Sequence, residues 1–136
     1  MNLVDLIDED QEAWVSAPVD PRFEIKIKFA SKDTIQRMHK NATVSKYDTK
    51  LRQRFDEVDD KHFVQNFVQE CVLDWKGLTV GVLRKMIPLK KGDLDDDTEV
   101  EFSHQSALEL IDKDTTDLGV WLLEAVRDLE NFSKKT

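Results

Sequence analysis

The sequence has few of the residues that build disulfide scaffolds, nucleotide loops and metal centres. Its 136 residues include a single cysteine, Cys71, which excludes an internal disulfide. The four glycines are scattered, so there is no glycine-rich loop to cradle a phosphate. The three histidines, His39, His62 and His104, share no metal-binding or nucleophile spacing with one another or with Cys71. We therefore expect no catalysis and no cofactor.

Long apolar runs and an excess of positive charge are also missing. No apolar run approaches the ~20 residues that a membrane-spanning helix needs. The first residues, Met1 to Asp5, show no basic region followed by an apolar core, so nothing indicates secretion. The 28 acidic residues outnumber the 20 basic ones, and the net charge of -8 repels a nucleic-acid backbone. The expectation is a soluble, cytoplasmic protein that binds neither nucleic acid nor membrane.

What is present is enough apolar sequence for one folded domain. Hydrophobic residues make up 40% of the chain and charged residues 35%, which favours a folded protein over a disordered one. Residues 23–29 alternate apolar and charged side chains, the period of a half-buried strand. Ser31 then offers an N-cap to a short helix that we expect to end near Asn41.

Helical periodicity dominates the middle of the chain. A broad apolar face predicts a central helix over residues 59–75, with Gly77 placed to close it in a left-handed conformation. Its largest side chains recur at every fourth position: Phe63, Phe67, Cys71 and Trp75. A second, weaker amphipathic stretch is predicted over residues 42–57, because its apolar residues also lie three or four positions apart: Val44, Tyr47, Leu51 and Phe55.

The second half combines an ambiguous segment, an acidic loop and two helical patterns. Residues 78–89 fit neither period cleanly and stay open between a strand and a short helix. An acidic loop over residues 90–101 follows, and residues 100–102 can form a brief strand that pairs with the preceding segment as a hairpin. Ser103 is the expected N-cap of one helix, and residues 118–132 predict a last amphipathic helix.

These patterns predict a mainly α fold with a small β element (α+β), a single-domain helical protein with one N-terminal strand and a short hairpin. We expect residues 1–21 to form an extended or flexible N-terminal arm. Residues 22–132 are the expected domain, and residues 133–136 a flexible tail.

The acidic loop is a weak candidate for a calcium site. Asp93, Asp95 and Asp97 occupy the first, third and fifth positions of an EF-hand loop. The sixth position, which requires glycine, is Thr98, and the twelfth, which requires a bidentate glutamate, is His104. A solvated loop is therefore favoured, and we expect no metal.

The order of the elements resembles a known family. The alternating strand over residues 23–31 runs into a short helix that ends at residues 41–43. Residues 63–71 then lead to the stretch Asp74-Trp75-Lys76-Gly77-Leu78-Thr79, and an acidic loop precedes residues 101–103 at the start of a helix. Over roughly residues 22–130 this arrangement is similar to the small tail assembly chaperones of long-tailed phages and prophages. The chain departs from the family in a basic and apolar insert at residues 80–91.

The resemblance implies a non-catalytic helical chaperone of the host bacterial cytoplasm. It would self-associate and coat the long apolar helices of the tape measure protein until tail tube subunits replace it. The residues that we expect to bind the partner are large apolar ones on the last and central helices: Trp75, Leu78, Trp121 and Leu122. Two alternatives stay open: another small phage structural or adaptor protein of the neck or baseplate, and a calcium-binding regulatory protein built on the acidic loop.

Overall fold

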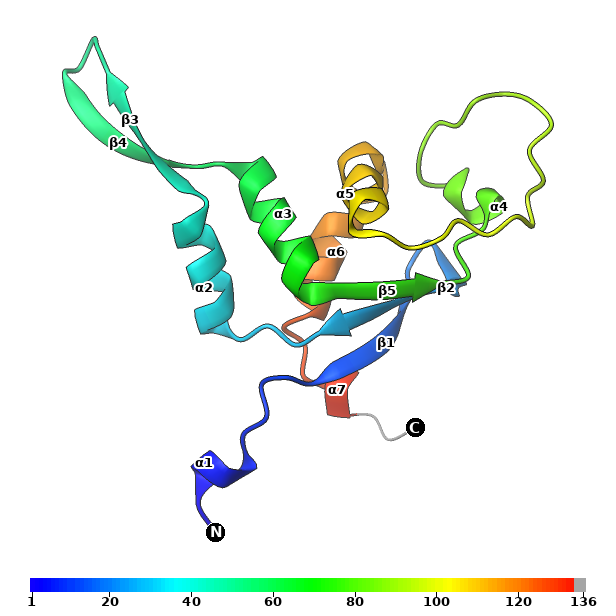
Figure 1. Ribbon diagram of the computed structural model, residues 1–136, viewed down its shortest axis with the longest axis horizontal. Helices are drawn as coiled ribbons and strands as arrows, with labels where there is room; N and C mark the ends of the chain where they lie inside the picture. The colour runs from blue at the N-terminus through cyan, green and yellow to red at the C-terminus, as the bar shows by residue number, and fades with distance from the viewer. Residues whose placement is uncertain (134–136) are drawn as a thin grey trace.

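The computed structural model describes residues 1–133, which form seven helices and five strands in two antiparallel sheets (Figure 1). The helices are α1 Leu3–Leu6, α2 Lys32–Asn41, α3 Asp60–Cys71, α4 Val80–Leu83, α5 His104–Lys113, α6 Leu118–Ala125 and α7 Glu130–Ser133. The strands are β1 Glu12–Ala17, β2 Asp20–Lys28, β3 Thr43–Asp48, β4 Gln53–Val58 and β5 Val72–Lys76.

A three-stranded sheet in the order β1-β2-β5 carries the core. Its central strand β2 has the alternation expected from the sequence, with Phe23, Ile25 and Ile27 at most 1% exposed. The neighbouring side chains Glu24 and Lys26 point to the opposite face, which is the outer, charged face of the sheet. The strand predicted over residues 23–29 is therefore confirmed, within one residue at its end.

Three helices, α3, α5 and α6, cover the apolar face of this sheet (Figure 1). Each contributes buried residues at helical spacing to the cluster that surrounds β2: Phe67, Val68, Ala107, Leu110, Leu118, Leu122 and Ala125. Helix α2 lies beside α3, where the Arg37 guanidinium donates two hydrogen bonds to the Glu70 carboxylate. The core is thus a small sheet with helices packed on one side of it.

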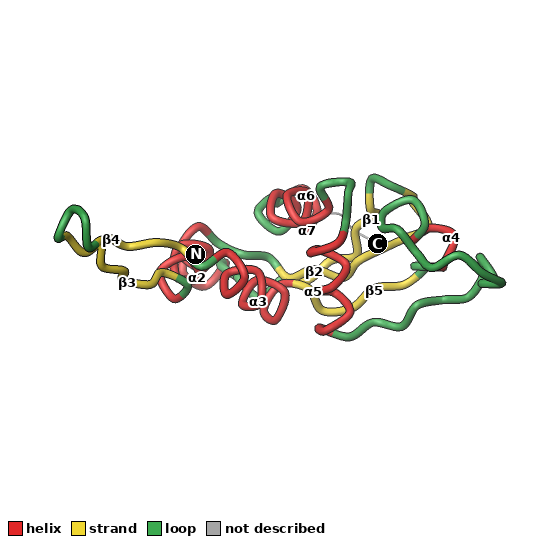
Figure 2. The backbone as a smooth tube through the Cα atoms, turned by 90° about the horizontal axis from the view of Figure 1, so that it is seen from above, coloured by secondary structure: helices red, strands yellow, loops and turns green. Residues whose placement is uncertain are grey.

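The other sheet is a hairpin of β3 and β4 that projects from the end of α2 and α3 (Figures 1 and 2). Its register pairs Lys46 with Phe55 and Tyr47 with Arg54, so the apolar side chains are divided between its two faces. At the turn, the Asp48 carboxylate accepts hydrogen bonds from the backbone of Lys50 and Leu51. Every residue of β4 is exposed, and the hairpin has no core of its own.

The prediction of a mainly α fold is wrong, because two stretches expected to be helical are strands. Residues 43–58 form the β3–β4 hairpin, although their apolar spacing also fits a helix. The predicted central helix ends at Cys71, and Val72 to Lys76 pair instead with β2, where Trp75 lies opposite Ile25. This long-range pairing overrides the local helical period. The chain is an α+β protein.

The two N-caps predicted from the sequence are confirmed. Ser31 accepts a hydrogen bond from the Thr34 backbone N–H and starts α2, and Ser103 accepts one from the Ser106 backbone N–H at the start of α5.

Residues 78–89 contain the short helix α4. Residues 99–100 meet the preceding segment only through a single antiparallel bridge between Thr79 and Glu99. The predicted last helix is divided into α6 and α7.

The N-terminal arm is shorter in the structure than the sequence suggests. Residues 12–17 form β1 and pair with β2, so of the expected arm only residues 1–11 precede the sheet. In that segment Leu3 to Leu6 form one exposed helical turn. Of the tail expected at residues 133–136, Ser133 ends α7, and the other three residues lie outside the described part of the chain.

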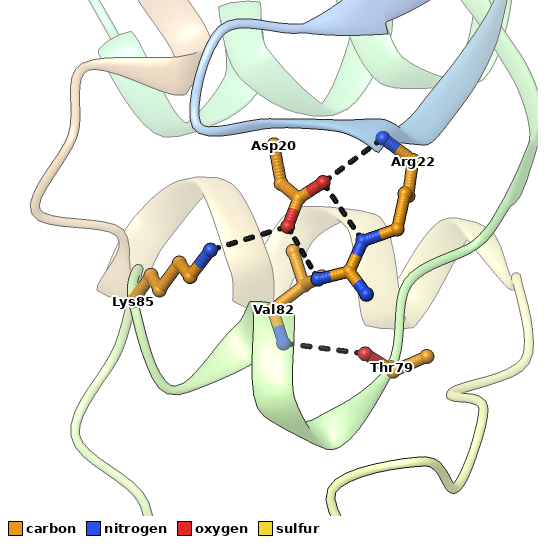
Figure 3. Close-up of polar contacts among 5 residues, drawn as sticks. All are labelled: Asp20, Arg22, Thr79, Val82 and Lys85. Carbon is orange, nitrogen blue, oxygen red and sulfur yellow. Dashed lines mark hydrogen bonds and ion pairs between the residues drawn. The ribbon is translucent and has the colours of Figure 1, made fainter.

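Asp20 fastens the segment after α4 to the sheet (Figure 3). Its carboxylate accepts hydrogen bonds from the backbone and guanidinium of Arg22 at 2.8–3.1 Å, and from Lys85 Nζ at 3.2 Å. Hydrogen bonding to Arg22 holds the pKa of this carboxyl well below its usual range. In the same segment Thr79 Oγ1 accepts from the Val82 N–H and caps α4. The basic insert at residues 80–91 is thereby tied to the turn between β1 and β2.

Replacing Asp20 by asparagine is expected to lower stability at pH 7 and to reduce the acid sensitivity of the fold. A carboxyl whose pKa is depressed on folding stabilises the protein above its unfolded pKa of about 4, and this contribution is lost as the pH falls further. The difference in the free energy of unfolding between the two proteins, measured by urea denaturation, should therefore be smaller at pH 3 than at pH 7. Asp93→Asn, at an exposed position, is the control. If Asp20→Asn lowered the free energy of unfolding equally at both pH values, the depressed pKa of the Asp20 carboxyl would be contradicted.

Candidate functional site

An open groove of about 450 Å³ lies between strand β1 and the last two helices. We call it the tryptophan groove, and it is lined by Trp14, Val15, Ser16, Trp121, Glu124, Ala125, Asp128 and Asn131. Strand β1 is at the edge of its sheet, and α7 lies beside it (Figure 1). Large aromatic side chains next to a sheet edge can bind another polypeptide through both apolar and backbone contacts.

Trp14 lies on the outer face of the sheet because it alternates with the inward-facing Ala13 and Val15. Its side chain is 39% exposed, a large fraction for a tryptophan. Lys76 Nζ of β5 lies 4.3 Å from the centroid of its ring, a distance typical of a cation–π contact. This contact covers part of the indole, and the residue remains 39% exposed at the groove that it lines.

Trp121 of α6 also lines the groove and is half-buried. Helix α6 buries Leu118, Leu122 and Ala125 against the sheet, and this spacing turns Trp121 toward the rim. Trp121 also lines a smaller hollow of about 190 Å³, together with Pro18, Val19, Thr116 and Leu118. Trp121 therefore lines two hollows, and an apolar ligand could contact it from either one.

The rim of the groove is acidic. Glu124 and Asp128 line it beside the two tryptophans. Asn131 Nδ2 donates a hydrogen bond to the Ala125 carbonyl, which holds α7 against the end of α6. Two indoles beside a negative rim favour a ligand that combines apolar and basic side chains.

The structure separates the residues that the sequence nominated for partner binding. Trp75, Leu78 and Leu122 are buried at 7%, 1% and 2% exposure, and Trp75 Nε1 donates to the Val100 carbonyl at 2.8 Å. Trp121 is the member of that set that reaches an open hollow. Trp14 is not in that set, because it lies in the segment over residues 1–21 that we expected to be an extended or flexible arm.

The acidic loop brings no ligand set together. Asp93, Asp95 and Asp97 are all exposed, and the Asp95 carboxylate accepts a hydrogen bond from the Asp97 backbone. Between them Asp96 pairs with Arg84 at 2.9 Å, which ties the loop to the end of α4. Within residues 1–133, no group of three His, Cys, Asp or Glu side chains is positioned to hold a metal ion.

Two of the three histidines, His39 and His104, and the cysteine make structural contacts. His39 stacks on Phe63 with ring centroids 4.2 Å apart, and His104 Nε2 lies 3.2 Å from the Val72 carbonyl oxygen. Cys71 is buried, and burial raises the pKa of its thiol to about 12. A thiol in this state is protonated at neutral pH and a poor nucleophile.

No helix in the described part of the chain has the length and apolar character needed to cross a membrane. Comparison with known proteins finds no match among family models, curated proteins or solved structures. The proposal for function therefore depends on the geometry of this chain and on the resemblance in its sequence.

Proposed function

We propose that this protein is a non-catalytic phage tail assembly chaperone that binds the tape measure protein. The tryptophan groove is the observation that carries the proposal, because the exposed Trp14 and the half-buried Trp121 both line one open hollow. Tryptophans in such positions contribute strongly to protein interfaces. The tail tube protein, which replaces the chaperone during assembly, is a further proposed partner.

An amphipathic helix with basic flanks fits this groove. Its apolar stripe would contact the two indoles, and its basic side chains would meet Glu124 and Asp128. The net charge of -8 keeps such a complex soluble while the apolar surface of the partner is covered. Capture of exposed helices until assembly begins is the behaviour expected of a chaperone.

Co-expression with the neighbouring reading frame for a long helical protein tests the proposal. We expect the long helical protein to be recovered in the soluble fraction and to be purified together with this chain. The chaperone should then be missing from finished virions, whereas a neck or baseplate component would be found in them. Failure to recover the long protein in a complex, under conditions where both chains are soluble, would refute the proposal.

Replacing Trp14 or Trp121 by alanine is expected to weaken binding of the tape measure helices by about tenfold or more, the effect typical of an interface hot spot. Trp14 is already 39% exposed, so its replacement should change thermal stability little. Titration calorimetry with a helical peptide of the partner measures the affinity, and a thermal melt measures the fold.

Val120→Ala is the matched control, because Val120 is 60% exposed on the same helix α6 and is not among the groove residues. It should bind the peptide as the unaltered protein does. Equal affinities for the Trp14, Trp121 and Val120 variants would show that the groove is not the binding site.

A further inference from the structure

The β3–β4 hairpin exposes several large apolar side chains to solvent. Tyr47 is 55% exposed, Leu51 67% and Phe55 46%. A two-stranded hairpin without a core is only marginally stable in water. Figures 1 and 2 show it standing away from the rest of the molecule, where both of its faces are open to a partner. A ligand that covers one face would stabilise it.

The outer half of the hairpin is basic although the protein is acidic. Residues 46–54 contain four basic side chains and one acidic side chain. Lys46 pairs with Glu57, and among the described residues Lys50, Arg52 and Arg54 make no ion pair. The surface that a partner meets here therefore combines apolar and positively charged side chains.

The N-terminal segment, residues 3–10, has the complementary composition. It contains four acidic side chains and no basic one: Asp5, Asp8, Glu9 and Asp10. Its four apolar side chains are between 57% and 79% exposed: Leu3, Val4, Leu6 and Ile7. Asp10 pairs with Lys28 at 3.2 Å, which anchors the end of the segment to the sheet and leaves the rest accessible.

We propose that the hairpin of one copy docks on the N-terminal segment of a second copy. Both surfaces are apolar and exposed, and their charges are opposite, so each supplies what the other lacks. In Figure 1 the hairpin and the N-terminal segment leave the body in different directions, so each copy presents both surfaces at once. If the two surfaces of one copy engage the same partner copy, the result is a closed twofold dimer, and if they engage different copies, the result is a ring or a filament.

Charge-reversal variants of the full chain test this contact. Lys50→Glu/Arg52→Glu/Arg54→Glu reverses the hairpin, and Asp5→Lys/Asp8→Lys/Glu9→Lys reverses the N-terminal segment. Sedimentation analysis over a range of concentrations should show the unaltered protein associating into a dimer or a larger assembly as the concentration rises. Each variant alone should associate at least about tenfold more weakly, because like charges then face each other across the contact.

Mixing the two variants is the decisive step. In the mixture, the negative hairpin of the first variant faces the positive N-terminal segment of the second. The unaltered positive hairpin of the second variant likewise faces the unaltered negative segment of the first. Association should therefore return to that of the original protein. A control variant, Lys90→Glu/Lys91→Glu/Lys113→Glu, changes the net charge equally at positions outside the hairpin and should associate normally.

Three outcomes would overturn the proposal. The unaltered protein could remain a monomer at every concentration, which would also be the result if the segment docked on the hairpin of its own chain. The variants could associate as strongly as the control, or mixing them could fail to restore association. Both charge variants keep Trp14 and Trp121, so capture of the tape measure protein is measured independently and can succeed or fail separately.

Discussion

Gly77→Ala is expected to lower the free energy of unfolding by about 3 kcal/mol or more, through the combined cost of backbone strain and overpacking. Gly77 has a φ of +74°, which a side chain disfavours. A Cβ at this position would also lie 1.9 Å from the Arg22 carbonyl oxygen. That oxygen belongs to β2, directly before the buried Phe23, so it cannot move away without disturbing the core.

Denaturant unfolding of the purified variant measures this effect. Gly119→Ala is the matched control, because Gly119 lies in α6 and a Cβ there would meet only Ile111 Cγ2 at 3.2 Å. Its added helix propensity, about 1 kcal/mol, offsets a modest crowding cost. Equal stabilities for the two alanine variants would mean that Gly77 does not lie against β2 as described.

The sequence predicted the secondary structure correctly where that structure depends on residues close together in the chain. The alternation around Phe23 predicted β2 because one face of that strand is buried and the other is not. Ser31 and Ser103 predicted two helix starts because an N-cap hydrogen bond reaches only three residues along the chain. The left-handed conformation of Gly77 was also predicted, although the residue follows a strand and not a helix.

Segments whose structure depends on distant partners could not be predicted in this way. Residues 72–76 are a strand because β2 offers an edge to pair with, and β2 lies far away in the sequence. In the hairpin, the helical spacing of Val44, Tyr47, Leu51 and Phe55 coexists with a turn that Asp48 stabilises. With so few apolar residues among many charged ones, the spacing is compatible with both a helix and a strand, so the sequence pattern alone could not distinguish them.

The candidate site shows the same division. Trp121 could be nominated from the sequence as a large apolar residue on an amphipathic helix. Trp14 could not, because its exposure follows from the place of β1 at the sheet edge and from α7 beside it. Trp75 belongs to the apolar face of the predicted central helix, but the pairing of β5 with β2 turns it into the core, and Leu78 after Gly77 is buried as well. Binding residues are therefore identified by the fold as much as by residue type.

Trp75→Ala is expected to destabilise the protein by about 3–5 kcal/mol, the usual cost of truncating a buried aromatic side chain. The ring packs edge-on against Phe23 at 6.0 Å between centroids and against Phe102 at 5.1 Å. Its Nε1–H donates to the Val100 carbonyl, so it also holds the segment before α5 against the sheet. The variant should unfold at a clearly lower denaturant concentration, as measured by far-ultraviolet circular dichroism.

Trp75→Phe separates the two contributions of this side chain. It keeps most of the buried aromatic surface and removes the hydrogen bond to Val100, so the expected loss is about 1–3 kcal/mol. Because Trp75 is only 7% exposed, the folded fraction of either variant should still bind the partner helix, unlike Trp14→Ala. If the phenylalanine variant kept full stability and lost binding, Trp75 would belong to the interface and the groove at β1 would not be the site.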